Sequence, residues 1–344
     1  MKMRAALFYG PKDVRLETVD APRAGAGEVI VKVEVALTCG TDLKTFQRGH
    51  PVLLKRFPSP FGHEFAGVVA EVGVGVEGFH PGMRVVAANS APCHQCFYCR
   101  AGETNLCENL DLLNGAYAEQ IRIPAAIVRE NLLTIPDSLS FRAAAFCEPL
   151  ACVLHGLDAV QLRPGEHVAI LGAGSIGLLL VQICKRAGAR VILVSRSAGK
   201  LKLARELGAD AVIDLETVRS REGVIRELTS HGQGVEVAIE AVGRPELWEL
   251  AVALTRKGGS AILFGGCESG TTMTLETKTL HYGERKVIGV FHHTPKAIRR
   301  ALELIASQQL QLDPLITDDL PLSELGNAFT RMASHGALKM AIYP

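Results

Sequence analysis

The run His167-Val-Ala-Ile-Leu-Gly-Ala-Gly-Ser-Ile-Gly177 decides the fold of this chain. A compact apolar strand ends at Leu171, and the glycines at 172, 174 and 177 follow with G-x-G-x-x-G spacing. Residues 176–186 then have the periodicity of a helix. A glycine turn between a strand and a helix indicates a dinucleotide site, because the backbone and the helix N-terminus can approach a pyrophosphate. The alternative is a turn that serves packing alone.

Strands and helices alternate from residue 166 onward. We expect strands at 191–194, 211–213, 235–239, 261–264 and 287–291, and helices at 176–186, 200–207 and 295–306. This alternation is typical of parallel βαβ units. Earlier residues read as short strands such as 29–35 and 65–72, and the C-terminal tail returns to short strands and a helix. The sequence therefore predicts a doubly wound domain inserted into a β-rich domain.

Composition argues against several kinds of partner. The 344 residues include 37 basic and 36 acidic side chains, so a net charge of +1 gives no electrostatic basis for binding nucleic acid or an anionic membrane. No unbroken apolar run reaches the length of a membrane span. The start, MKMRAALFYG, lacks a secretory apolar region, and the chain has nine cysteines. We therefore expect a cytoplasmic protein whose thiols serve metal binding or packing.

The run PCHQCFYCRAGETNLC carries four cysteines: Cys93, Cys96, Cys99 and Cys107. Four thiolates at C-x2-C-x2-C-x7-C spacing can complete a tetrahedron around one ion, which describes a structural zinc site. Disulfides are one alternative, although a reducing compartment disfavours them. An iron–sulfur cluster is another, because cysteines hold those clusters too.

The end of the next predicted strand bears on the choice of cofactor. Ser195-Arg196-Ser197 stands where a carboxylate would bind the ribose 2′-hydroxyl of NAD. A serine with an adjacent arginine can instead accept a 2′-phosphate, and Lys200 lies one helical turn further on. We expect NADP to be preferred. The alternative is that Arg196 stacks on adenine and either cofactor is used.

Three separated motifs carry groups that can bind a second metal. They are Cys39-Gly-Thr-Asp42, Gly62-His63-Glu64 and Cys147-Glu148-Pro-Leu150. Each motif alone is unremarkable, since a single His or Cys is usually structural. Together they offer thiolate, imidazole and carboxylate, which suits a catalytic zinc with three protein ligands and one open position.

The full set of motifs resembles the zinc-dependent medium-chain dehydrogenases of the alcohol, polyol and threonine dehydrogenase family. Gly62-His63-Glu64-x2-Gly67-x5-Gly73-x2-Val76 matches that family's zinc signature, and the cysteine lobe, Gly115–Glu119, Glu148–Leu150 and the glycine fingerprint follow in family order. The resemblance covers essentially the whole chain. It implies a GroES-like catalytic domain at 1–153 and 291–344, an inserted Rossmann domain at 154–290, and an active site in the cleft between them.

The resemblance also implies roles for single residues. Cys39 and His63 resemble the first two ligands of the catalytic zinc, and Glu64 and Glu148 resemble carboxylates that bind or approach it in the polyol and threonine branch. Asp42 resembles the carboxylate that orients the zinc-bound histidine. Simple alcohol dehydrogenases have a cysteine near position 148, so Cys147 is the alternative ligand after a one-residue shift.

Thr41 resembles the hydroxyl that takes the substrate proton. Many relatives then carry a histidine that passes this proton to solvent, but this chain has Lys44 there. A lysine relays a proton only when it is deprotonated. Lys44 could instead bind a hydroxyl-rich or anionic part of the substrate, or it could simply be solvated.

We therefore expect a dehydrogenase with one catalytic and one structural zinc per chain. Its substrate would be a secondary alcohol, most simply a polyol, sugar or amino alcohol, and the chain would form a homotetramer or homodimer. The alternatives are a threonine 3-dehydrogenase type of enzyme and a non-catalytic nucleotide-binding relative. The predicted cofactor contacts are Gly172, Gly174, Ser175, Ile176, Gly177, Ser195, Arg196, Lys200, Val242, Phe264, Gly265, Gly266, Val290 and Phe291.

Overall fold

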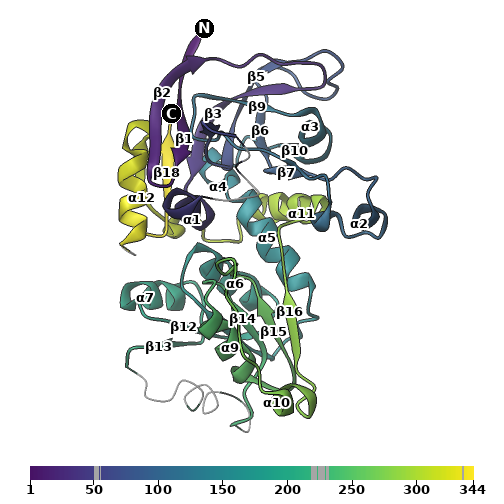
Figure 1. Ribbon diagram of the computed structural model, residues 1–344, viewed down its shortest axis with the longest axis vertical. Coiled ribbons are helices and arrows are strands. Elements are labelled where there is room, and N and C mark those ends of the chain that lie inside the picture. The colour runs from purple at the N-terminus through teal and green to yellow at the C-terminus, as the bar shows by residue number, and fades with distance from the viewer. Residues whose placement is uncertain (50–53, 55, 218–222, 224–228, 230–231, 335–336) are drawn as a thin grey trace. The chain divides into compact units, whose positions relative to one another are not determined.

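The chain divides into two compact units in the computed structural model (Figure 1). The first unit comprises Met1–Ala151 and His293–Pro344, and the second comprises Cys152–His292. The predicted boundaries lie at 153/154 and 290/291. The structure describes residues 1–49, 54, 56–217, 223, 229, 232–334 and 337–344.

The second unit is built on a six-stranded parallel sheet in the order β13-β12-β11-β14-β15-β16. The strands are β11 (His167–Leu171), β12 (Arg190–Ser195), β13 (Ala211–Asp214), β14 (Val235–Glu240), β15 (Thr255–Leu263) and β16 (Lys286–Gly289). This arrangement confirms the predicted doubly wound parallel sheet. The predicted strand at 287–291 is wrong at its end, because β16 pairs only with β15, and that ladder stops at Leu263↔Gly289.

Helices of this unit cover both faces of the sheet, as Figure 1 shows for α6 and α9. They are α6 (Ser175–Arg186), α7 (Ala198–Glu206), α9 (Pro245–Leu254) and α10 (Thr277–His281). Leu250 and Leu254 of α9 share a buried cluster with Ala169 and Leu171 of β11. On the opposite face, Ile170 lies against Gly177 of α6. Successive residues of β11 therefore serve opposite faces, as a period of two requires.

The first unit is mostly β, as predicted. A seven-stranded sheet has the path β10-β6-β5-β3-β18-β17, with β9 also paired to β3, and a smaller sheet has the order β2-β1-β4. The strands are β1 (Lys2–Gly10), β2 (Asp13–Asp20), β3 (Val29–Leu37), β4 (Ser59–Pro60), β5 (Glu64–Val72), β6 (Arg84–Ala87), β9 (Gln120–Ile123), β10 (Leu132–Thr134), β17 (Ile316–Pro321) and β18 (Lys339–Tyr343). The paired strands β7 (Ser90–Ala91) and β8 (Asp111–Leu112) stand apart from these two sheets.

Strand β18 comes from the far end of the sequence and completes the large sheet. Leu37 of β3 lies opposite Glu64 of β5 on one side and Ala341 of β18 on the other. The register therefore brings three distant segments together just before Cys39. The apolar faces of these strands enclose a core that includes Phe8, Phe61 and Phe329.

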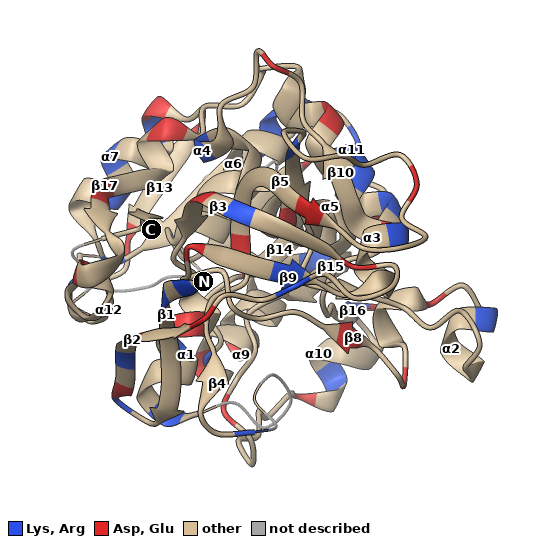
Figure 2. Cartoon of the chain, turned by 90° about the horizontal axis from the view of Figure 1, so that it is seen from above, with Lys and Arg blue, Asp and Glu red and all other residues tan. Residues whose placement is uncertain are grey.

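Short helices surround this sheet and carry several of the predicted site residues. They are α1 (Gly40–Arg48), α2 (Phe97–Arg100), α3 (Ala125–Asn131), α4 (Phe141–Ala144), α11 (Pro295–Ala306) and α12 (Leu325–Ala333), with α5 (Cys147–Asp158) starting in the same unit. The predicted helix at 295–306 is confirmed. Among the described residues, no helix combines the length and apolar character that crossing a bilayer requires. Basic residues (blue) and acidic residues (red) are both spread over the ribbon in Figure 2, in keeping with the 37 basic and 36 acidic side chains of the sequence.

Candidate functional site

The four-cysteine lobe forms a compact cluster of thiols. The sulfur atoms of Cys93, Cys96, Cys99 and Cys107 all lie within 4.8 Å of one another. The Cys93 N–H points to Cys107 Sγ at 3.2 Å, and Gln95 N–H points to Cys93 Sγ at 3.5 Å. Backbone N–H groups of Gln95 and Cys96 lower the pKa of the Cys93 thiol to about 6. The four sulfur atoms are close enough to share one ion, and the N–H groups that point to them stabilise thiolates. Both features fit a closed zinc site.

A second cluster lies where β3, β5 and β18 converge. Potential ligand atoms of Cys39, His63 and Glu64 lie within 4.8 Å of one another. Cys39 caps the N-terminus of α1, and His63 directly precedes β5. Glu64 is completely buried, and its Oε1 has no hydrogen-bond partner among the described residues. This carboxylate oxygen is buried beside a thiol and an imidazole, and a bound cation would give it the partner that it lacks.

His63 is oriented by a buried carboxylate. Its Nδ1 lies 2.9 Å from Asp42 Oδ1, and Asp42 is only 2% exposed. Burial alone would lower the pKa of His63, but Asp42 and Cys39 raise it well above the usual value. Without an ion, this anionic environment therefore favours a proton on His63, and a bound zinc would supply the same positive charge. The contact to Asp42 through Nδ1 leaves Nε2 for a metal.

Tyr117 extends this arrangement, and the sequence analysis gave it no role. Its hydroxyl donates to Asp42 Oδ2 at 2.5 Å and lies 3.3 Å from the carbonyl oxygen of Leu37. Burial and the Asp42 charge raise the pKa of Tyr117 well above 10.0, so it stays a donor. Its ring fills the space beside Gly62, where any Cβ would lie 2.5 Å from Tyr117 Cδ2. The glycine before His63 is therefore required by the ring that orients Asp42.

Lys339 is the other residue that sequence reasoning missed. Its Nζ donates to Glu64 Oε2 and, at 3.0 Å, to the carbonyl of Thr38. Both charged side chains are essentially inaccessible to solvent. Burial alone would lower the pKa of Lys339, but Glu64 and Cys39 raise it above its usual value. The lysine therefore brings a fixed positive charge to the edge of the metal cluster.

The structure distinguishes the two candidates at the start of α5. The Cys147 thiol donates to the carbonyl of Ile298 at 3.4 Å, and burial raises its pKa far above normal. Glu148 is 7% exposed, and its charge acts on Lys339. Within the part of the chain that the structure describes, Glu148 lies outside the group formed by Cys39, His63 and Glu64. Cys147 is thus a buried core residue, whereas the charge of Glu148 acts on Lys339 beside the metal cluster.

Thr41 and Lys44 both lie on α1, next to the metal cluster. Thr41 donates its backbone N–H to Cys39 Sγ at 3.4 Å, and both side chains are half-buried. Thr41 and Lys44 are three residues apart, which places their side chains on one face of the helix. The structure therefore groups the predicted proton acceptor with the lysine that replaces the usual histidine.

The glycine fingerprint has the geometry that the sequence predicts. Gly172 has φ +114°, and a Cβ there would lie 2.6 Å from Val242 Cγ2. A Cβ on Gly177 would lie 1.8 Å from the carbonyl oxygen of Gly172, so no side chain fits where α6 meets β11. Gly174 caps the start of α6 and faces open space. This open backbone at a helix N-terminus leaves room for a pyrophosphate.

Ser195, Arg196 and Lys200 lie at or just after the carboxyl end of β12. Ser195 ends the strand, and Arg196 is exposed. Among the described residues the Arg196 guanidinium has no ion-pair or hydrogen-bond partner. Burial lowers the pKa of Lys200, which lies in the first turn of α7. This end of the sheet therefore offers a serine hydroxyl and a basic side chain where the sequence predicts a 2′-phosphate site.

The remaining predicted cofactor residues lie beyond the ends of β14, β15 and β16. Val242 and Phe291 are 38% and 57% exposed, and Gly266 faces open space. Phe264 and Val290 instead lie against Gly156. Since every strand is parallel, these residues lie at the same carboxyl edge as the fingerprint.

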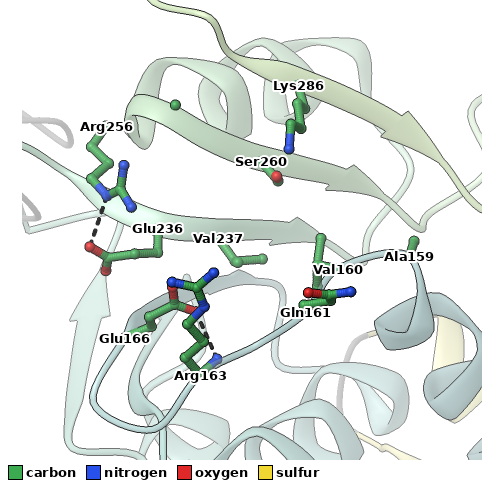
Figure 3. A pocket seen from close by; sticks show the side chains of 11 residues that line it. Ala159, Val160, Gln161, Arg163, Glu166, Glu236, Val237, Arg256, Ser260 and Lys286 are labelled. Atoms are coloured by element: carbon green, nitrogen blue, oxygen red, sulfur yellow. Dashed lines mark hydrogen bonds and ion pairs between the residues drawn. The ribbon is translucent and has the colours of Figure 1, made fainter.

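A cavity of about 510 Å³ lies at the opposite, amino edge of this sheet (Figure 3). The polar side chains that line it are those of Gln161, Arg163, Glu166, Glu236, Arg256, Ser260 and Lys286. Arg256 Nε donates to Glu236 at 2.9 Å, and the His167 N–H donates to the same carboxylate at 2.7 Å. Ligands of open α/β sheets bind outside the carboxyl ends of the strands. This cavity is therefore not the dinucleotide site.

Comparison with known proteins places both units in one family. Residues 25–137 match the alcohol dehydrogenase GroES-like domain, and residues 175–307 match the zinc-binding dehydrogenase domain. The chain is 30% identical to D-arabinitol dehydrogenase 1 of Uromyces fabae, over 100% of this chain and 97% of the relative. It is also 30% identical to the sorbitol dehydrogenase of Bacillus subtilis, over 99% and 97% of the two chains.

The structural comparison agrees. A zinc-binding dehydrogenase from Sinorhizobium meliloti, whose crystal structure contains NADP, superposes with a TM-score of 0.92. It is 34% identical in sequence, and the match covers 100% of both chains. The likeness therefore extends over the GroES-like and the Rossmann parts together.

Proposed function

Because the chain belongs to the zinc-dependent medium-chain dehydrogenases, and is thus an NAD(P)-linked oxidoreductase of secondary alcohols, we propose that it oxidises a polyol, sugar or amino alcohol with NADP. The observation that carries this proposal is the buried group of Cys39, His63 and Glu64. Carboxylates beside the thiolate are typical of the polyol branch. The relatives named for arabinitol and sorbitol support the same class of substrate.

The residues of the first unit have separate parts in this reaction. Cys39 and His63 hold the catalytic zinc together with Glu64 or Glu148, and Asp42 fixes the His63 ring. The bound zinc supplies a Lewis acid for the alcohol oxygen, and NADP supplies the hydride acceptor. Thr41 relays the hydroxyl proton of the alcohol to solvent, because its half-buried hydroxyl gives up its own proton as it takes the one from the substrate. We assign Lys44, on the same face of α1, to binding a further hydroxyl of the substrate.

The cofactor lies along the carboxyl edge of the second unit in this proposal. The backbone around Gly174 and the start of α6 hold the pyrophosphate, with contacts from Gly172, Ser175, Ile176 and Gly177. Ser195, Arg196 and Lys200 hold the 2′-phosphate. The exposed guanidinium of Arg196 supports the preference for NADP, because a charge-assisted bond to phosphate has no counterpart in NAD.

Metal content, compartment and assembly complete the proposal. The four-cysteine lobe holds a second, structural zinc, which gives two zinc ions per chain. No disulfide joins the nine cysteines, all of which the structure describes, and this fits a reducing compartment such as the cytoplasm. Strand β16 is an edge of the described sheet and offers backbone groups for pairing across a two-fold axis in a dimer or tetramer. A monomer in light scattering would reject that assembly.

A screen of polyols, sugars and amino alcohols with both cofactors tests the proposal. We expect reduction of NADP with a secondary alcohol and little reduction of NAD. The double variant Ser195→Asp, Arg196→Leu should shift kcat/KM toward NAD, because it removes phosphate donors and adds a repelling charge. If the wild type already prefers NAD by about tenfold, roughly 1.4 kcal/mol, the assignment of these residues is wrong.

A further inference from the structure

Glu240 is a completely buried carboxylate at the carboxyl end of β14. Its Oε1 accepts the backbone N–H groups of Val242 and Gly243, both at 2.8 Å. Its Oε2 accepts the indole N–H of Trp248 at 3.0 Å and again the Gly243 N–H at 3.1 Å. Fully buried carboxylates are uncommon, and both oxygens of this one accept N–H groups from the loop after β14 or from α9.

The same residue also fixes the loop that follows the neighbouring strand. The carbonyl oxygen of Glu240 accepts the N–H groups of Phe264 and Gly265, at 2.9 and 3.0 Å. Trp248 of α9 closes the connection, because its indole N–H also lies 3.1 Å from the Gly265 carbonyl. The carboxylate of Glu240 therefore holds the backbone of residues 242–243 and reaches Gly265 through Trp248, while its backbone carbonyl holds residues 264–265.

The loop after β14 and the loop after β15 are packed closely against each other. A Cβ on Gly265 would lie 2.3 Å from the Gly243 nitrogen and 2.7 Å from Glu240 Oε2. On the other side of the loop, a Cβ on Gly172 would lie only 2.6 Å from Val242 Cγ2, so Val242 packs directly against that glycine. A shift of the Glu240 carboxylate would therefore be passed through Val242 to the first glycine of the nucleotide fingerprint.

We infer that Glu240 is a positioning residue for the nicotinamide cofactor, acting through the backbone of residues 242–243 and 264–265. It does not itself touch the cofactor. The inference rests on the proposed placement of the cofactor along this edge of the sheet. Trp248, the only tryptophan of the chain, donates to Glu240 and therefore reports on this network.

Strand β14 supplies its own control. Glu236 lies four residues before Glu240 and therefore on the same face of the strand, but at the amino edge, where it pairs with Arg256 beside the cavity of Figure 3. Both carboxylates accept a backbone N–H and a side-chain N–H. Glu236→Gln therefore disturbs a carboxylate on the same strand, partly exposed and paired with an arginine, at the opposite edge from the cofactor.

The experiment measures cofactor affinity and stability of the zinc-loaded protein side by side. Dissociation constants for NADP and NAD are obtained by calorimetry for the wild type, Glu240→Gln and Glu236→Gln, together with melting temperatures. We expect Glu240→Gln to weaken cofactor binding by about tenfold or more, because the amide nitrogen cannot accept the N–H groups that hold the loop after β14 in place. Glu236→Gln should leave the dissociation constant of the cofactor within about twofold of the wild-type value, even where both variants lose similar stability. Cofactor binding should also change Trp248 fluorescence in the wild type.

Gly265→Ala provides a second route to the same result if Glu240→Gln does not fold. Its Cβ pushes on the Glu240 carboxylate and should weaken cofactor binding in the same direction. Unchanged cofactor affinity in a folded Glu240→Gln or Gly265→Ala variant would overturn the inference, and so would equal weakening by Glu236→Gln. If the wild type binds neither NADP nor NAD, the placement of the cofactor itself fails, which is a separate outcome.

Discussion

Replacing Lys339 with methionine should destabilise the first unit strongly. Lys339 and Glu64 form an ion pair whose side chains are 1% and 0% exposed. Methionine keeps the buried stem but removes the charge, so Glu64 stays in the interior without its cation. Breaking a buried pair in this way costs about 3–5 kcal/mol. In a unit of this size the melting temperature should fall by roughly 6–20 °C.

The assay is thermal unfolding of the metal-free and the zinc-loaded protein. The loss should be largest without metal, because a zinc ion beside Glu64 compensates part of its charge. Glu64→Gln in the Lys339→Met background should restore much of the stability, since the unpaired charge is then gone. Lys339→Arg keeps a positive charge and should lie closer to the wild type.

An exposed ion pair of the same unit is the control. Arg331 and Asp318 lie 2.6 Å apart with side chains 38% and 44% exposed, so Arg331→Met should cost no more than about 1 kcal/mol. If Lys339→Met in the metal-free protein costs as little as Arg331→Met, the buried pair does not stabilise the site, and the argument is refuted.

Further substitutions separate the roles of the thiols and carboxylates. Cys93→Ser should remove one zinc and lower the melting temperature, whereas Cys39→Ser should remove the other zinc and abolish turnover with little loss of stability; equal effects on both properties in both variants would contradict the two roles. Glu148→Ala should lower zinc affinity and kcat, while Cys147→Ala should leave both nearly unchanged, and metal analysis with turnover of the two variants would reveal the reverse order. Burial would raise the pKa of Glu236, but the His167 N–H and Arg256 outweigh it and hold that pKa below 4.5. A lowered carboxyl pKa stabilises the fold only while the group is ionised, so the difference in melting temperature between wild type and Glu236→Gln should be constant at neutral pH and shrink below pH 4.5; a difference independent of pH would contradict this.

Local patterns were sufficient to predict most of the fold. The strand, glycine turn and helix from His167 to Arg186 form one contiguous signal, and the structure reproduces it. The end of β16 was wrong by two residues, because the apolar run continues through Val290 and Phe291 after the neighbouring strand has ended. Sequence periodicity carries no information on where a partner strand stops.

The site could be predicted only as far as its motifs are local. Cys39, His63 and Glu64 stand in recognisable runs, and the structure brings them together. Lys339 contacts Glu64 across 275 residues of sequence, and Tyr117 contacts Asp42 across 75. The register of β3, β5 and β18 brings Lys339 to Glu64, and Tyr117 reaches Asp42 from a segment outside these strands. No local pattern of the sequence encodes either contact.

The most direct test of the account is zinc content measured together with alcohol-dependent reduction of NADP in one preparation of the protein. We expect two zinc ions per chain in the wild type, together with reduction of NADP by a polyol or related secondary alcohol. We expect one zinc ion and no reduction in Cys39→Ser. Turnover that persists in a Cys39→Ser protein lacking the second zinc would contradict the catalytic role assigned to Cys39, His63 and Glu64.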